Sequence, residues 1–304
     1  MSQRPVILVT GKTGQVGGEL LQALAPLGSI VAPARDEMDL ANAASIRAAI
    51  RAAQPRWIVN PAAYTAVDKA ESEPDLAYAI NAEAVQTIGE EARQIGAAVI
   101  HFSTDYVFDG SATMPYRETD TTNPINVYGA SKLAGERALA ASGATHMIFR
   151  TSWLYGAIGK NFLLTILKLA RERDKLHIVA DQHGAPTWSH DLAKMTAHVI
   201  ARCEAIAGGR PLPAAIADLN GIYHAAGAGE TTWYGFAFEA IRLRRNKEPG
   251  ATFADIQAIS TAEYPTPAKR PMNSCLNCGK LEQQFGWEMM NWHESLREVL
   301  AELR

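Results

Sequence analysis

The sequence predicts an α/β protein in which a Rossmann-type, doubly wound parallel sheet is followed by a smaller C-terminal substrate-binding domain. Short apolar runs, rich in Val and Ile and without clean alternation, are typical of strands that are buried on both faces. Helical patterns separate these runs, and such alternation of strands and helices is typical of a parallel sheet. A glycine-rich stretch, GKTGQVG at residues 11–17, directly follows the first run.

Each element follows from a local pattern. Strands are expected where the β-branched apolar runs lie, at 5–10, 29–35, 56–63, 97–104, 146–153, 176–181 and 221–227. Helices are expected where apolar residues recur at helical spacing, from the glycines to about residue 26 and at 41–54, 73–96 and 127–142. A closing helix carries an apolar stripe that we assign to its own core, formed by Leu296, Val299, Leu300 and Leu303.

The composition is that of an ordinary globular protein. The chain has 304 residues, of which 47% are hydrophobic and 20% are charged, and its formal net charge is −3. A chain without a basic surplus is not expected to bind nucleic acid, and no apolar run approaches the ~18 residues of a membrane-spanning helix. Three cysteines are too few for a disulfide framework. We therefore expect a cytoplasmic protein without a nucleic-acid or membrane partner.

Gly11, Gly14 and Gly17 form a G-x-x-G-x-x-G pattern, one spacing variant away from the usual dinucleotide-binding fingerprint. The pattern follows a strand and opens a helix, which is the context that the fingerprint requires. Glycines permit a tight turn, and the helix N-terminus offers N–H groups to a pyrophosphate. We therefore expect residues 1–155 to form an NAD(P)-binding domain, with a return of the chain near 187–227, and residues 156–304 to form mainly the substrate-binding domain.

The end of the second strand bears on the choice of nicotinamide cofactor. An acidic residue there binds the ribose 2′-hydroxyl of NADH, whereas an arginine suits the 2′-phosphate of NADPH. Arg35 comes first in this sequence and Asp36 follows it, so the pattern favours NADPH and leaves NADH possible.

A tyrosine and a lysine share one face of the expected helix 127–142. Tyr128 and Lys132 lie four residues apart, and their helix follows the strand that ends in Ser103 and Thr104. A free tyrosine has a pKa of about 10, and a neighbouring ammonium would lower that pKa toward neutrality. The spacing alone is common by chance, but here it follows a dinucleotide-binding pattern.

With these features in this order, residues 5–155 resemble the extended branch of the short-chain dehydrogenase/reductase family. The resemblance implies that Tyr128 donates a proton to a carbonyl oxygen as hydride arrives from the nicotinamide. It also implies that Lys132 holds the nicotinamide ribose and that Thr104 hydrogen-bonds the reacting oxygen.

Further blocks, in order and over nearly the whole chain, resemble those members of this branch that reduce nucleotide-linked 4-keto-6-deoxysugars. The blocks are NPAAYTAVDKAE (60–71), STDYVF (103–108), FRTSW (149–153), GAPT (184–187) and TPAKRP (266–271). The resemblance places the cofactor against Gly14, Gln15, Val16, Asp39, Leu40, Ala63, Tyr64 and Thr65. It places the nucleotide sugar against Thr104, Asp105 and Trp153, with Arg270 as a contact to the diphosphate.

Some relatives are dimers bridged by a magnesium ion on acidic residues, one of which matches Glu19. After the GAPT block this chain has His190 and Asp191, and a histidine is a poor magnesium ligand. We therefore expect no metal site, and a homodimer, if it forms, without a magnesium bridge. Cys275 and Cys278 match C-x-x-C but lack a second ligand pair, so we interpret them as incidental thiols.

Three functions remain open on the sequence. The first is an NADPH-dependent 4-ketoreductase of a nucleotide sugar, and the second is a reductase of a different nucleotide-linked 4-keto-6-deoxysugar. The third is a non-catalytic regulatory subunit that binds a dinucleotide. The complete set of Thr104, Tyr128 and Lys132 favours catalysis, because a pure binding module need not keep acid–base residues.

Overall fold

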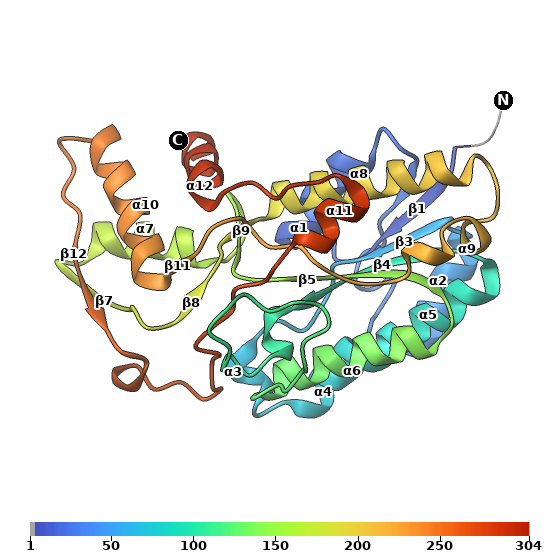
Figure 1. Ribbon diagram of the computed structural model, residues 1–304, viewed down its shortest axis with the longest axis horizontal. Coiled ribbons are helices and arrows are strands. Elements are labelled where there is room, and N and C mark those ends of the chain that lie inside the picture. The colour runs from blue at the N-terminus through green and yellow to red at the C-terminus, as the bar shows by residue number, and fades with distance from the viewer. Residues whose placement is uncertain (1–3, 304) are drawn as a thin grey trace.

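A six-stranded parallel sheet forms the larger part of the molecule (Figure 1). The structure, a computed structural model, describes residues 4–303. The strands lie in the order β10-β5-β4-β3-β1-β2, and each neighbouring pair is parallel, which confirms the predicted sheet. The strands are β1 (Val6–Val9), β2 (Ser29–Val31), β3 (Trp57–Asn60), β4 (Ala98–Thr104), β5 (Thr145–Thr151) and β10 (Gly221–His224). The strand order reverses between β1 and β3, where sheets of this type bind their ligands.

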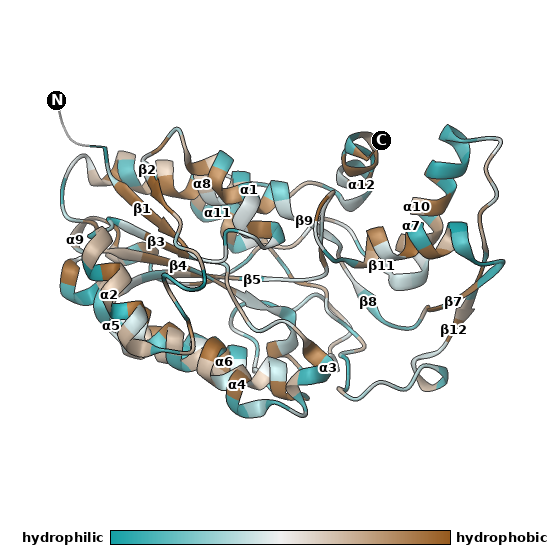
Figure 2. Ribbon diagram, turned by 180° about the vertical axis from the view of Figure 1, so that it is seen from behind, coloured by the Kyte–Doolittle hydropathy of each residue, from teal (hydrophilic) through white to brown (hydrophobic). Residues whose placement is uncertain are grey.

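Helices cover both faces of this sheet (Figure 1). One face carries α1 (Gln15–Leu24) and α8 (Ser189–Ala207), and the other carries α2 (Ala43–Ala53), α5 (Ala84–Ile95) and α6 (Val127–Ala141). Ile7 and Val9 belong to the core beneath α1 and α8, whereas Leu8 between them belongs to the core beneath α2 and α5. Figure 2 colours β1 as hydrophobic, and burial on both faces explains why the sequence of this strand lacks alternation.

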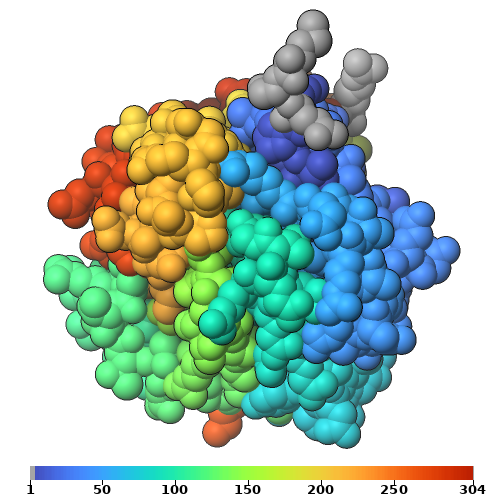
Figure 3. Space-filling model, turned by 90° about the vertical axis from the view of Figure 1, so that its right-hand side faces the viewer, coloured from blue at the N-terminus to red at the C-terminus, as the bar shows by residue number. Residues whose placement is uncertain are grey.

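The strands run toward the smaller, C-terminal part of the chain (Figure 1). Figure 3 views the opposite end, where segments coloured blue, teal, lime and gold lie side by side in the order of the strands that they precede. The loops that follow β1, β3, β4 and β5 therefore lie between the two parts of the molecule.

The smaller part is built from helices and short two-stranded sheets. α7 (Phe162–Glu172) and α10 (Trp233–Lys247) pack against the parallel pair β7 (Lys175–Val179) and β12 (Asp255–Ile259). α12 (Trp292–Glu302) packs on the other side of α10 and shares a core with α7 and α10. β8 (His183–Gly184) pairs with β11 (Thr231–Thr232), and β6 (Leu154–Tyr155) pairs with β9 (Thr187–Trp188). The strand expected at 176–181 thus lies outside the main sheet. The stripe of Leu296, Val299 and Leu300 is buried in this part's own core.

The second and third strands end earlier than the sequence predicted. They stop at Val31 and Asn60, because Pro33 and Pro61 lack the N–H group that a strand ladder needs.

The helix expected at 73–96 has an interruption. It begins as α4 (Pro74–Tyr78) and passes through a π-helical turn, η1 (Ala79–Glu83), before α5. Short elements complete the chain: α3 (Val67–Ala70), η2 (Asp105–Val107), α9 (Leu212–Ala215), η3 (Ala217–Leu219), η4 (Thr261–Glu263) and α11 (Gly279–Phe285). Among residues 4–303 no helix combines the length and apolar character needed to cross a membrane.

Gly17→Ala is predicted to destabilise the turn between β1 and α1, whereas Gly18→Ala at the next position is not. A Cβ on Gly17 would lie 2.0 Å from the Gly11 carbonyl oxygen, while the nearest atom to a Cβ on Gly18 lies 3.7 Å away. We expect Gly17→Ala to lower the free energy of unfolding by about 1–3 kcal/mol. We expect Gly18→Ala to raise it by about 0.5–1 kcal/mol, since alanine favours a helix over glycine. Urea unfolding measures both values, and equal stability of the two variants would contradict the prediction.

Candidate active site

The glycine loop joins β1 to α1 at the carboxyl edge of the sheet. Gly11 has a φ of +60° and lies so close to Ala62 that a Cβ on Gly11 would come within 3.0 Å of the Ala62 Cβ. Gly14 precedes the helix and provides no side-chain cap. The first turn of any helix leaves N–H groups without an intrahelical partner, and these groups suit a pyrophosphate.

A loop from the C-terminal part holds Gln15. The Asn161 Nδ2 donates to Gln15 Oε1 at 3.0 Å and to the Gly156 carbonyl oxygen at 3.0 Å. The side chain of Val16 is buried in the core, so any contact of Val16 with a cofactor would be made by its main chain. No local pattern in the sequence indicates that the 156–161 loop reaches the glycine loop.

The loop after β2 presents cationic side chains. Arg35 lies exposed in a turn, and Lys12, which sequence reasoning missed, donates from Nζ to the Ala32 carbonyl oxygen at 2.9 Å. Asp39 is half-buried and accepts a hydrogen bond from the Ala41 N–H, while Leu40 packs against the core. The lysine inside the glycine pattern was the available signal for this second cation.

The loop after β3 is fixed by Asn81, a residue of the π-helical turn that sequence reasoning also missed. Asn81 Oδ1 accepts from the Tyr64 N–H at 2.8 Å, and Asn81 Nδ2 donates to the Tyr64 carbonyl oxygen at 3.1 Å. The Tyr64 hydroxyl donates to Glu73, and this bond raises the pKa of Tyr64. Ala63 and Thr65 flank this anchored residue.

Thr104 and Tyr128 meet where β4 ends and α6 begins. The Thr104 hydroxyl donates to Asp105 Oδ1 at 2.9 Å and accepts from the Tyr106 N–H at 3.2 Å. Burial raises the pKa of Tyr128 above its ordinary value, and a hydrogen bond with Thr104 partly offsets this rise. A phenol in these surroundings keeps its proton at neutral pH, as a proton donor must.

Lys132 is buried behind Tyr128. Its Nζ donates to the Phe102 carbonyl oxygen at 2.7 Å and lies 3.2 Å from His101 Nε2. Burial lowers the pKa of Lys132 to about 8, and the Glu136 carboxylate partly offsets this effect. The sequence suggested that Lys132 lowers the pKa of Tyr128. In the structure the ammonium is bound to β4 instead, and burial raises the pKa of the phenol.

Asp105 is buried next to Thr104, directly after the end of β4. Burial raises the pKa of its carboxyl to about 6, and hydrogen bonds from Ser274 and Thr104 partly offset that rise. A recess of about 400 Å³ opens next to Ser274, between the 110–115 segment and residues 272–275. Asp105 is therefore linked through Ser274 to the 272–275 segment, which lines one side of this recess.

Trp153 is held in a strained conformation. Its φ is +46°, which is unusual for a bulky residue. Its ring stacks on Trp233 at a centroid distance of 3.6 Å, and the Trp233 Nε1 donates to Gln182. A Cβ on Gly184 would lie 2.5 Å from the Trp153 ring. Sequence reasoning found Trp153 but missed Trp233, because stacking between distant residues leaves no spacing pattern.

Arg270 is engaged by an acidic partner. Its Nη1 and Nη2 both donate to the Asp68 carboxylate at 2.8 Å, and the pKa of Asp68 is lowered by this pairing. The guanidinium that we expected to be free for a diphosphate thus joins the 266–271 segment to α3.

The positions expected to matter for magnesium form a different arrangement. His190 Nδ1 lies 2.8 Å from Glu19 Oε2, and Asp191 accepts a hydrogen bond from the Met290 N–H. Among the described residues, no group of three or more His, Cys, Asp or Glu side chains could hold a metal ion.

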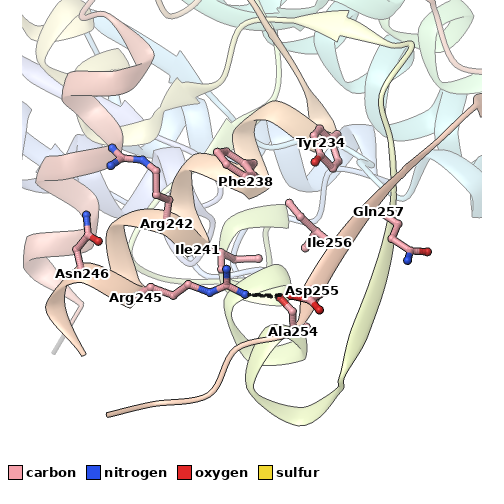
Figure 4. Close-up of a pocket in the computed structure, with 10 residues that line it drawn as sticks. All are labelled: Tyr234, Phe238, Ile241, Arg242, Arg245, Asn246, Ala254, Asp255, Ile256 and Gln257. Atoms are coloured by element: carbon pink, nitrogen blue, oxygen red, sulfur yellow. Dashed lines mark hydrogen bonds and ion pairs between the residues drawn. The ribbon is translucent and has the colours of Figure 1, made fainter. Parts of the chain in front are cut away.

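A second recess, of about 360 Å³, lies in the smaller part between α10 and β12 (Figure 4). Tyr234, Phe238 and Arg245 are among its lining residues, and Arg245 pairs with Asp255. None of the residues predicted for the site lines this recess.

Nearly the whole length of the chain is similar to known reductases. It fits the family model described as RmlD substrate binding domain over residues 5–304. It is 46% identical over 303 residues to the dTDP-4-dehydrorhamnose reductase of Escherichia coli (strain K12), covering 98% of this chain and 97% of that protein. It is 47% identical over 302 residues to the dTDP-4-dehydrorhamnose reductase of Burkholderia thailandensis, covering 98% of each.

Solved structures agree. The crystal structure of dTDP-4-dehydrorhamnose reductase from Bacillus anthracis str. Ames in complex with NADP matches with a TM-score of 0.88 and 32% identity, covering 99% of this chain and 100% of that chain. An ortholog from Clostridium acetobutylicum matches with a TM-score of 0.88 and 35% identity, covering 98% and 99%. Given this identity over its full length and the shared fold, the chain belongs to the dTDP-4-dehydrorhamnose reductase family of NAD(P)H-dependent oxidoreductases.

Proposed function

We propose that this chain reduces the 4-keto group of dTDP-4-dehydro-L-rhamnose to give dTDP-L-rhamnose, with NADPH as the preferred reductant and Tyr128 as the proton donor. The observation that carries the proposal is the meeting of a protonated Tyr128 with Thr104 at the carboxyl end of β4. A reductase of another nucleotide-linked 4-keto-6-deoxysugar would use the same groups, so assays with both substrates separate the two.

The residues present fit a dinucleotide. A Cβ would crowd Ala62 at position 11 and the Gly11 carbonyl oxygen at position 17, so the two glycines permit the tight turn that brings main-chain N–H groups to a pyrophosphate. Gly14, Gln15 and Val16 would hold the phosphates, Asp39 and Leu40 the adenosine, and Ala63, Tyr64 and Thr65 the remaining face. Bound NADPH supplies the hydride.

Protein groups then hold and move the proton. Tyr128 keeps its proton because burial raises its pKa, and it would release that proton to the keto oxygen as negative charge develops there. Thr104 would hydrogen-bond the same oxygen when its proton is not donated to Asp105. Lys132, charged below a pKa of about 8, would hold the nicotinamide ribose and supply a positive field to the site.

The sugar nucleotide would lie on the side of Tyr128 and Thr104 that faces away from the cofactor. Asp105 and Trp153 would contact the sugar, and the ring of Trp153 is fixed for this purpose by Trp233. Arg270 would contact the diphosphate from its position against Asp68.

Tyr128→Phe removes only the phenolic hydroxyl, which is the proposed proton donor. We expect kcat to fall by about 10²–10⁴-fold, the usual contribution of a general acid, while NADPH binding and thermal stability stay close to the parent values. Steady-state kinetics with a pre-steady-state test for rate-limiting chemistry measures this effect. Tyr78→Phe on the exposed surface of α4 is the matched control. A loss of less than about threefold would exclude Tyr128 as the donor.

Arg35→Ala tests the choice of cofactor. If Arg35 clamps the 2′-phosphate, its loss removes a charge-assisted hydrogen bond worth about 1.5–3 kcal/mol, or roughly 10- to 150-fold in KM for NADPH. The KM for NADH should change little, because NADH lacks the phosphate, and it is the internal control. Equal effects on both cofactors would refute the assignment.

Magnesium is not expected to support activity or assembly. The His190 ring is in hydrogen-bond contact with the Glu19 carboxylate, and a neutral imidazole is a poor magnesium ligand. Turnover and sedimentation velocity in EDTA and in added magnesium should therefore agree. A dimer that dissociates on chelation and re-forms with magnesium would show that Glu19 and Asp191 do share an ion.

A further inference from the structure

His101 lies in the middle of β4 with no exposed surface. Its Nε2 is 3.2 Å from the Lys132 Nζ, and its Nδ1 is 3.1 Å from the Asn60 Nδ2. The Asn60 Oδ1 in turn lies 2.6 Å from the Thr10 hydroxyl. A buried chain of polar groups therefore runs from the catalytic helix across β4, β3 and β1 to the residue before the glycine loop.

Hydrogen-bond accounting fixes the protons of this chain. The Lys132 ammonium has three N–H donors: one reaches the Phe102 carbonyl oxygen, one reaches His101, and the third is left for a ligand. A neutral imidazole carries one N–H. If Nε2 accepts from a charged Lys132, then Nδ1 must be the donor, and Asn60 must turn its amide oxygen toward it. If instead the Asn60 amide nitrogen donates to Nδ1, then Nε2 carries the proton and can bond only a neutral lysine.

The charge of Lys132 is thus tied to the tautomer of His101. Burial and the neighbouring Lys132 hold the pKa of His101 well below its ordinary value, so the ring stays neutral. The other titratable groups near Lys132 are Tyr128 and Glu136 on its own helix, Asp105 after β4, and His146 and Arg150 on β5. Glu136 is bound by Arg150 at 2.9 and 2.7 Å, and Glu136 raises the pKa of Lys132 and so favours the ammonium.

We propose that His101 is a positioning residue for Lys132, acting as the Nδ1–H tautomer whose Nε2 fixes the ammonium beside Tyr128. In this state the Asn60 amide is turned so that its oxygen accepts from Nδ1–H and its nitrogen donates to the Thr10 hydroxyl, which extends the hold on Lys132 to the cofactor loop. The inference rests on the proposed function, since it assigns Lys132 its role in turnover. It also explains why a polar ring lies between the buried apolar residues Ile100 and Phe102.

The first test removes the ring. His101→Leu should lower kcat/KM by about 10- to 100-fold, the usual effect of losing a hydrogen bond to a charged group. The alkaline limb of the pH profile of kcat/KM should shift to a pH about one unit lower, because an unpaired buried ammonium deprotonates more readily. His101→Gln, which places an amide oxygen near the position of Nε2, should restore most of the activity and the parent profile.

His146→Leu is the matched control. This second buried histidine lies on the next strand and bonds the Ala144 carbonyl oxygen rather than Lys132, so its removal should leave the alkaline limb in place. If His101→Leu changes kcat/KM and the pH profile no more than His146→Leu does, the inference is wrong. A parent protein that does not turn over the sugar nucleotide would refute the proposed function instead.

A second measurement does not depend on a variant that folds. Nitrogen-15 NMR of histidine-labelled parent protein reports which ring nitrogen of His101 is protonated. We expect Nδ1–H and an unprotonated Nε2 at neutral pH. An Nε2–H tautomer or an imidazolium at that pH would overturn the inference.

Discussion

The burial of the Lys132 ammonium is the constraint on which the surrounding structure depends. Taking an ammonium out of water is costly unless it is paired and hydrogen-bonded. Lys132 is only 2% exposed, and the Phe102 carbonyl oxygen, the His101 ring and the Glu136 carboxylate together offset that cost. Arg150 holds Glu136 in place. Groups on β4, β5 and α6 therefore cooperate to keep one positive charge at the edge of the sheet.

Close contact between main chains fixes the helix that carries this charge. A Cβ on Gly129 would lie 2.1 Å from the Tyr106 carbonyl oxygen, and a Cβ on Gly135 would lie 2.0 Å from the Asn81 carbonyl oxygen. α6 thus rests directly on η2 and η1. Because Asn81 also holds the backbone of Tyr64 and the Ser131 hydroxyl, the π-helical turn joins α6 to the loop after β3.

Features written in local sequence could be predicted, and features made by distant partners could not. The glycine loop and the shared face of Tyr128 and Lys132 depend on spacing within a few residues, and the buried strands depend on short apolar runs. By contrast, the Arg270–Asp68 pair joins residues 202 positions apart, and the sequence around Arg270 does not predict this pairing. The direction of the pKa shift of Tyr128 was missed for the same reason, since burial is a property of the folded chain and is the main cause that raises this pKa.

The hydroxyl of Thr104 has one proton, and Asp105 decides where that proton points. While Asp105 is ionised, Thr104 donates to Asp105 Oδ1 at 2.9 Å and accepts from the Tyr106 N–H, so it cannot also donate to a keto oxygen. Burial raises the pKa of Asp105 to about 6. Below that pH the carboxyl can donate to Thr104 and release the Thr104 proton toward the proposed substrate. Tyr128 keeps its own proton in both states, because its pKa is raised. The charge of Asp105 therefore governs the hydrogen bond from Thr104 but leaves the proton of Tyr128 available throughout.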